Sequence, residues 1–232
     1  MTKPVCIVVG IGPGNGAAFA KRFARDYRLA LLSRRTDYSS ELAKQLPGAQ
    51  AFACDVADPD AVTHAFGQVA AKMGAAQVLL YNAGSGVWGS VEDVSVDDFE
   101  LAWKVNCRGA LLASRQVIPS MLEAGKGAIV FTGATASLRG GANFAAFASA
   151  KAAQRNLAQS MARHLWPKGI HVGLLIVDGM VDLPRTRERM PDAPDDKFLK
   201  PAAIADTVWN LVHQDRSAWS FEVEARPFVE KW

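Results

Sequence analysis

Short apolar runs alternate with longer amphipathic runs along almost the whole chain. Seven of the short runs are typical of β-strands: 5–10, 29–33, 49–55, 77–84, 127–133, 170–178 and 218–224. Between them, apolar residues recur at helical spacing in 17–27, 39–46, 59–74, 96–125, 143–166 and 202–214. Apolar strands separated by helices indicate a parallel sheet covered on both faces. We therefore predict an α/β fold in which residues 1–232 form a single domain, with a doubly wound parallel sheet of about seven strands and helices on both faces.

Residues 184–201 interrupt this alternation. The segment "PRTRERMPDAPDDKFLKP" is rich in proline and in charged residues. Such a composition is typical of a surface loop, and it equally suits a lid over a substrate. We expect this segment to be the most mobile part of the chain and keep both interpretations.

Composition and charge narrow the class of protein. The net charge of +3 is small and the basic residues are scattered, so we expect no nucleic-acid partner. Cys6, Cys54 and Cys107 are far apart and odd in number, which argues against a disulfide framework and favours a reducing, cytoplasmic location. The histidines lack Cys or Asp partners at ligand spacing, so we expect no metal. Residues 5–10 are too short an apolar run for a signal peptide, and no run is long enough to span a membrane.

A glycine-rich loop follows the first predicted strand. Gly10, Gly12, Gly14, Asn15 and Gly16 lie between that strand and the first predicted helix. Glycines at this point let the backbone approach a pyrophosphate, which then lies at the positive end of the helix. The position of the pattern, more than the pattern itself, predicts a dinucleotide site.

The end of the second predicted strand indicates which dinucleotide. An NAD(H) site offers a carboxylate there for the ribose 2′-hydroxyl. This chain instead has Ser33, Arg34 and Arg35. Two guanidinium groups can form forked, charge-assisted bonds with a 2′-phosphate, so the sequence favours NADP(H) over NAD(H).

From residue 5 to about residue 225, the chain resembles the short-chain dehydrogenase/reductase family. Gly10, Gly14 and Gly16 match its G-x-x-x-G-x-G loop. Further matching positions are Asp55 and Val56, the Asn82-Ala83-Gly84 turn, Asn106, Lys151, and Gly179 and Val181 in the loop after the sixth strand. The resemblance implies a Rossmann fold and oxidoreductase activity. It assigns cofactor contacts to the glycine loop with Asn15, to 55–56, 82–84, Lys151, Gly179 and Val181, and an active-site role to Asn106 and Lys151.

The resemblance fails at the residues that move a proton. The family has a tyrosine four residues before the lysine, and here that residue is Phe147. It has a serine thirteen residues before the tyrosine, and here that residue is Ala134. Val9 replaces the usual threonine before Gly10, and Asp178 replaces the proline before Gly179. The resemblance therefore implies a retained Lys151 without the Ser/Tyr proton relay.

Other groups could supply the missing proton. Thr135 and Ser137 follow Ala134, although we favour ordinary loop hydrogen bonds for both. Asp178 is a candidate if burial raises the pKa of its carboxyl, and a cap or turn role suits it equally well. Lys151 could donate directly or through water. Alternatively, an iminium or a polarised C=C accepts hydride without a donor at an oxygen.

Two aromatic residues have both a structural and a functional interpretation. Phe147 lies on the same helical face as Lys151 and should point where the tyrosine ring would, yet with Phe144 it also forms an ordinary packing pair. Trp88 either forms a wall of the substrate pocket or is a partly exposed loop residue.

Two functions remain open on the sequence alone. The favoured one is an NADP(H)-dependent oxidoreductase that transfers hydride to a C=O, C=N or polarised C=C of a small molecule. The alternative is an inactive NADP(H)-binding sensor or subunit, which the loss of Ser and Tyr would suit. Segments 96–125 and 143–166 resemble the helices through which family members associate, so we expect a homodimer or homotetramer.

Overall fold

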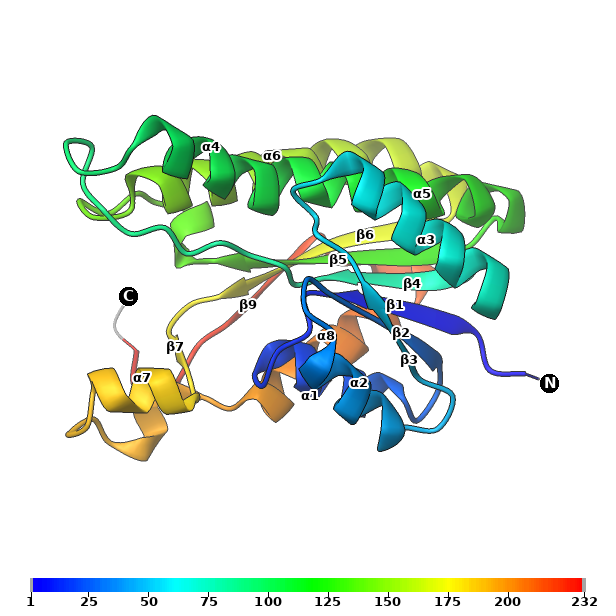
Figure 1. Cartoon of the computed structure of the whole chain (residues 1–232), viewed down its shortest axis with the longest axis horizontal. Coiled ribbons are helices and arrows are strands. Elements are labelled where there is room, and N and C mark those ends of the chain that lie inside the picture. Colours follow the sequence, from blue (N-terminus) through cyan, green and yellow to red (C-terminus); the bar gives the residue numbers. More distant parts are fainter. Residues whose placement is uncertain (1, 231–232) are drawn as a thin grey trace.

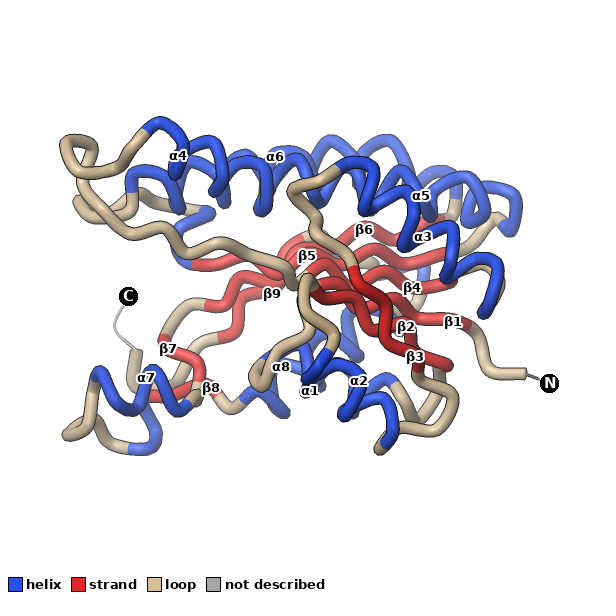
Figure 2. Tube along the Cα trace, viewed as in Figure 1, coloured by secondary structure: helices blue, strands red, loops and turns tan. Residues whose placement is uncertain are grey.

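The computed structural model describes residues 2–230, and its centre is one sheet of seven parallel strands. The strand order is β3-β2-β1-β4-β5-β6-β9, and every neighbouring pair is parallel (Figure 2). The strands are β1 (Val5–Val9), β2 (Arg28–Ser33), β3 (Gln50–Ala53), β4 (Ala76–Tyr81), β5 (Gly127–Ala134), β6 (Ile170–Val177) and β9 (Glu222–Ala225). The predicted α/β fold with a doubly wound parallel sheet is confirmed.

Helices cover both faces of this sheet (Figure 1). One face carries α3 (Pro59–Met73), α4 (Val96–Trp103), α5 (Gly109–Ala124) and α6 (Ala145–Leu165). The other carries α1 (Asn15–Phe23), α2 (Asp37–Lys44) and α8 (Pro201–Val212). Short 3-10 turns lie at Thr135–Ser137, Trp166–Lys168, Asp195–Lys197 and Arg216–Ala218.

The hydrophobic core lies in two layers, one on each side of the sheet. Successive side chains of a strand point to opposite faces, so Ile7 and Val9 belong to one apolar cluster while Cys6 and Val8 belong to the other. Because both faces are covered, the strands carry unbroken apolar runs, which is why the sequence pattern identifies them. Within the described residues, no helix is long and apolar enough to cross a membrane.

The long helix expected over 96–125 is three elements. Between α4 and α5 lies a π-helical turn, Lys104–Arg108. Ser95 starts α4, where its Oγ accepts a hydrogen bond from the Asp98 backbone at 3.1 Å. The apolar period continues through the wider turn, so periodicity alone does not reveal it. Single π-turns within helices frequently occur at functional sites, and this one contains Asn106.

Residues 184–201 contain more regular structure than the sequence pattern indicated. The segment includes α7 (Pro184–Arg189), and β8 (Phe198–Leu199) pairs with β7 (Met180–Val181) in a separate two-stranded sheet. The Arg187 guanidinium binds Asp182 at 2.8 Å and Asp195 at 2.6 Å, and it lies 4.1 Å from the Phe198 ring centroid. Figure 1 shows α7 apart from the central sheet, at the end towards which β6 runs.

Candidate functional site

The glycine loop between β1 and α1 is shaped by close backbone contacts. Gly10 has a φ of +92°, and a Cβ added there would lie 2.4 Å from the Ala83 nitrogen. A Cβ at Gly16 would lie 2.5 Å from the Gly10 oxygen, whereas one at Gly12 would meet no atom within 4 Å. Gly10 and Gly16 therefore let the loop fold tightly, while Gly12 leaves its outer side open. A loop whose backbone packs closely against the protein, and whose outer side meets no other atoms, leaves room for a pyrophosphate.

Neighbouring elements hold this loop in place. The Asn82 side chain at the end of β4 donates to the Gly10 carbonyl at 2.9 Å. Leu183, just before α7, covers Gly14, because a Cβ there would lie 2.7 Å from Leu183 Cδ2. In the first turn of α1, the buried Asn15 Oδ1 has no hydrogen-bond partner among the described residues. The loop thus contacts β4 on one side and Leu183, directly before the 184–201 segment, on the other.

At the end of β2, two arginines are available to a ligand. The Ser33 hydroxyl donates to the Arg35 carbonyl at 2.8 Å and lies 2.9 Å from the Ser39 hydroxyl, which fixes the backbone turn. Arg34 and Arg35 are exposed. Within the described part of the chain, neither guanidinium has an ion pair or a hydrogen bond. Both remain free to bind an anion.

A hydrogen-bonded turn follows β3. Asp55 Oδ1, after β3, accepts a hydrogen bond from the Ala57 backbone at 2.9 Å. Val56 is buried, and a Cβ at Gly109 would lie 2.9 Å from the Val56 carbonyl oxygen. Asp55 and Val56 are therefore held at the same edge of the sheet as the glycine loop.

Lys151 is the only lysine among the described residues that is buried, and its amine is bonded to neutral groups. Its Nζ donates to the Thr132 carbonyl of β5 at 2.7 Å and to Gln154 Oε1 at 3.1 Å. Removal from water disfavours the ammonium form, so burial lowers the pKa of Lys151 from 10.5 to about 7. Lys151 can consequently gain or lose a proton near neutral pH.

Asn106 lies beside Lys151 and is completely buried. Its Nδ2 donates to the Ser85 carbonyl at 3.1 Å and to the Ala102 carbonyl at 2.8 Å. Its Oδ1 has no partner among the described residues. A Cβ built on Gly84 would lie 3.3 Å from this Oδ1 and 3.9 Å from Lys151 Nζ. The loop after β4, the π-turn and α6 therefore meet at one point.

Gln154 completes this group and was missed by sequence reasoning. It is fully buried, and its Nε2 donates to the Asn106 carbonyl at 2.8 Å while its Oε1 accepts from Lys151. The available signal was a polar residue one helical turn after Lys151, on the apolar side of α6. Such a residue requires a buried hydrogen-bond partner.

Three aromatic side chains lie together at the start of α6. The Trp88 ring centroid is 5.2 Å from that of Phe147 and 4.8 Å from that of Phe144. The loop that carries Trp88 is fixed to α6, because the Gly89 carbonyl accepts from the Ala145 backbone at 3.3 Å. The Trp88 and Phe144 side chains stay partly exposed, at 53% and 37%. The group therefore presents an apolar, open wall.

The end of β5 holds the other candidates for proton transfer. Ser137 Oγ accepts a hydrogen bond from the Ala134 backbone at 3.1 Å. The Thr135 hydroxyl donates to Asp178 Oδ1, and Asp178 Oδ2 pairs with the Arg226 guanidinium at 2.7 Å. Both Asp178 oxygens thus act as acceptors from a hydroxyl and a cation. Thr135 and Asp178 are therefore bonded to each other, and Asp178 is also paired with Arg226.

The loop after β6 is closely packed. Gly179 has a φ of +143°, and a Cβ there would lie 2.8 Å from Pro227. Val181 pairs with Leu199 in the β7–β8 sheet. These contacts place the loop between β6 and the 184–201 segment.

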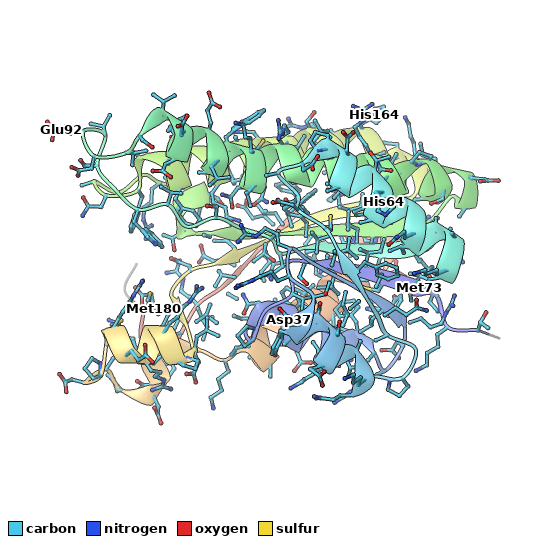
Figure 3. All side chains as sticks on the ribbon, viewed as in Figure 1. Asp37, His64, Met73, Glu92, His164 and Met180 are labelled. Atoms are coloured by element: carbon cyan, nitrogen blue, oxygen red, sulfur yellow. The ribbon has the colours of Figure 1, made fainter. Side chains whose placement is uncertain are left out.

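The histidines lie outside this group. Figure 3 shows His64 on α3 and His164 towards the end of α6, in the helical layer on one face of the sheet. His64 Nε2 is 3.0 Å from Gln68, and His164 Nε2 is 2.8 Å from Lys168. The described residues contain no group of three or more His, Cys, Asp or Glu side chains that could hold a metal ion.

The chain matches a known class of proteins in sequence and in fold. Residues 4–193 match the family of short chain dehydrogenases, so the chain belongs to that family of oxidoreductases. It is 32% identical over 230 residues to 2-(R)-hydroxypropyl-CoM dehydrogenase of Xanthobacter autotrophicus, covering 91% of this chain and 92% of that protein.

Solved structures show the same relationship. A short-chain dehydrogenase from Rhodopseudomonas palustris is 35% identical with a TM-score of 0.83, covering 97% of this chain and 99% of that one. An alcohol dehydrogenase of the archaeon Thermococcus sibiricus, complexed with 5-hydroxy-NADP, is 25% identical with a TM-score of 0.88 and covers 99% and 98% of the two chains.

The buried lysine predicts a pH dependence of stability. The pKa of Lys151 is about 7 in the folded protein and 10.5 is its ordinary value, so between these values the unfolded chain binds more protons. The free energy of unfolding therefore gains a contribution that rises with pH across this window and is lost as pH falls to 7. Lys151→Met removes that contribution. Denaturant titrations should show the variant gaining stability relative to wild type at about pH 7 and losing this advantage, on the order of 1–3 kcal/mol, towards about pH 10.

The exposed Lys126 provides the control. Lys126→Met should differ from wild type by the same amount at every pH. A stability difference for Lys151→Met that stays constant over the whole window would contradict a lysine of lowered pKa.

Proposed function

We propose that this protein is an NADP(H)-dependent oxidoreductase that transfers hydride to a C=O, C=N or polarised C=C of a small molecule without the usual Ser/Tyr proton relay. Membership of the short chain dehydrogenase family supports the reaction class. The Thermococcus sibiricus structure with 5-hydroxy-NADP supports the cofactor. The observation that carries the proposal is the buried Lys151 amine beside Asn106, at the edge where the glycine loop opens.

The residues at this edge fit such a cofactor in order along the sheet. The backbone from Gly10 to Gly16 and the start of α1 would hold the pyrophosphate, with Asn15 in the first turn. Arg34 and Arg35, beside Ser33, would bind the 2′-phosphate. The remaining contacts would come from Asp55 and Val56, the 82–84 turn, Lys151, and Gly179 with Val181. The nicotinamide, when bound, supplies or takes the hydride.

Few side chains in this site could exchange a proton with the substrate. Phe147 and Ala134, which we assign to the Tyr and Ser positions, carry no hydroxyl. Tyr81 donates to the Val105 carbonyl at 2.5 Å within the core, so its hydroxyl is already used. Thr135 and Asp178 bind each other, which makes them the second choice for this role. Lys151, with its pKa of about 7, is the group that we propose exchanges the proton.

The apolar wall indicates what kind of substrate is favoured. Trp88, Phe144 and Phe147 offer flat rings and no carboxylate or guanidinium group. Rings of this kind bind planar unsaturated groups, and they also attract cations over their faces. An iminium meets both conditions and needs no proton at the atom that accepts hydride, because its positive charge is neutralised in the same step. We therefore rank iminium compounds and conjugated C=C bonds ahead of simple ketones.

The segment 184–201 is the proposed lid of the single domain. Its support is the contact of Leu183, the residue directly before the segment, with Gly14 of the glycine loop. The bonds of Arg187 to Asp182 and Asp195 give the segment internal rigidity, so it would move as a unit.

The alternative of an inactive NADP(H)-binding sensor or subunit is less well supported. The relatives reported above bear the names of dehydrogenases. A buried lysine with a lowered pKa is also costly to keep in a protein that only binds.

We propose that the chain forms a homodimer or homotetramer through α4, α5 and α6. The support is apolar exposure on the first two helices: Phe99, Leu101, Trp103 and Leu111 are each at least 39% exposed. Light scattering should give a mass of two or four chains, and a monomer at about 10 μM would contradict the proposal.

The cofactor preference can be tested at Arg34 and Arg35. Replacing both with Ala should weaken NADPH binding by about 10- to 100-fold, because two charge-assisted bonds to the 2′-phosphate are lost. NADH binding should change by less than about threefold, since its ribose has no phosphate. Calorimetry measures both constants. Arg25→Ala, at an exposed arginine after α1, should change neither, and equal losses for the two cofactors would refute the assignment.

The missing relay can be tested by restoring it. Ala134→Ser combined with Phe147→Tyr should raise NADPH-dependent ketone reduction by about 10²- to 10⁴-fold, the usual contribution of general acid catalysis. Reduction of cyclic iminium compounds by the wild type should already be measurable. Phe144→Tyr adds a hydroxyl to the neighbouring ring and should gain nothing. A wild type that reduces simple ketones as fast as the double variant would overturn the proposal.

A further inference from the structure

Gln154 links the two polar groups that define the proposed reaction site. It lies one helical turn after Lys151 on α6, and its side chain is fully buried. One end of its amide accepts from Lys151 Nζ at 3.1 Å, and the other donates to the Asn106 carbonyl at 2.8 Å. The Asn106 carbonyl belongs to the π-turn, so the amide joins two helical elements.

The orientation of the Gln154 amide is determined by its partners. A backbone carbonyl can only accept, so the amide nitrogen must face Asn106. The amide oxygen then faces Lys151. A flipped amide would set two oxygens against each other at Asn106 and two donor groups against each other at Lys151. Both buried contacts would be lost, which is costly where no water replaces them.

Counting the positions around Lys151 Nζ shows what this orientation achieves. A neutral amine has two N–H bonds and one lone pair. Thr132 and Gln154 accept the two hydrogens, at 2.7 and 3.1 Å. A single position remains, which is a lone pair in the neutral amine and a third N–H in the ammonium form. This position can take up or release a proton without disturbing the other two bonds.

We propose that Gln154 is a positioning residue for the proposed reaction: anchored on the Asn106 carbonyl, it holds the Lys151 amine so that its one remaining position stays open to the bound cofactor and substrate, where the proton is exchanged. The proposal rests on the hydride-transfer function given above. Gln154 acts through Lys151 and needs no contact with substrate or cofactor.

The electrostatic surroundings agree with this role. The neutral Gln154 amide orients the lysine without supplying a counter-charge. Burial therefore still lowers the pKa of Lys151 from 10.5 to about 7. Charged groups on the elements around this end of α6 are bonded elsewhere: Arg155 to Glu222, Lys104 to Glu100, Asp178 to Arg226, and Arg108 to the Ala57 carbonyl. The Cys107 thiol on the π-turn has its pKa raised by burial and carries no charge near neutral pH. The groups bonded to the Lys151 amine are therefore neutral when it gains or loses its proton.

Two substitutions of similar size test the proposal by shifting this titration in opposite directions. Gln154→Glu places a negative charge at the amine and should raise the pKa of Lys151 by about one unit or more. Gln154→Met keeps the side-chain volume, removes an acceptor from the ammonium form, and should lower the pKa. NMR titration of lysines labelled with ¹³C at Cε, with the Lys151 signal identified by its loss in Lys151→Met, measures the pKa with and without NADPH.

Catalysis should follow the same pattern. With a substrate that needs a proton, such as a ketone, Gln154→Met should reduce kcat by about tenfold or more, while the Kd of NADPH stays within about threefold. The pH–rate profile should move up for Gln154→Glu and down for Gln154→Met. Asn156→Ala, which removes an exposed amide from the same helix, should leave the pKa, kcat and Tm unchanged.

The outcomes separate this inference from the proposed function. If no substrate is turned over but the Lys151 pKa moves in opposite directions, Gln154 positions the amine and the reaction class is wrong. If folded variants with a Tm near that of wild type show no shift, or the same shift, Gln154 only packs the core and the inference is overturned. A variant that fails to fold is replaced by Gln154→Asn, whose shorter amide cannot reach both partners and should lower the pKa as Gln154→Met does.

Discussion

Lys151 carries an amine into the interior of the protein, where its hydrogen bonds go to a backbone carbonyl and a neutral amide. Burying an ammonium group without a counter-charge is unfavourable, so the protein keeps the amine close to its neutral form at physiological pH. Three neighbouring elements meet at that group. The π-turn brings Asn106 to α6, Gln154 joins the two elements, and the loop after β4 passes over both at Gly84.

The parallel sheet is what brings these parts to one place. The carboxyl ends of its strands lie along a single edge, so the loops after β1, β2, β3, β4, β5 and β6 all open there. Asn82 ties the loop after β4 to the glycine loop, and the Thr132 carbonyl of β5 accepts from the lysine. A ligand along this edge would meet the arginines after β2 at one end and the apolar wall of Trp88, Phe144 and Phe147 at the other.

Features that depend on residues close together in the sequence could be predicted from local sequence patterns. The strands, the glycine loop and the placement of Phe147 and Lys151 on one helical face follow from apolar period and spacing, and the fold is confirmed. Contacts between distant residues were not predictable in this way. The Asp178–Arg226 pair joins residues 48 positions apart, and Gln154 reaches a backbone atom on another helix. The π-turn also stayed hidden, because its residues continue the apolar period of the helices beside it.

The central claim of the proposal is that Lys151 exchanges the proton that a tyrosine exchanges in the family pattern, at the position where this chain has Phe147. The most direct measurement is the rate of hydride transfer in a single turnover, followed by loss of NADPH absorbance from about pH 5.5 to about pH 9 in wild type and in Lys151→Met. With a substrate that must be protonated, we predict one inflection near the lysine pKa of about 7 in wild type and none in the variant. A wild-type rate that does not change with pH, or an inflection that persists in Lys151→Met, would contradict the account.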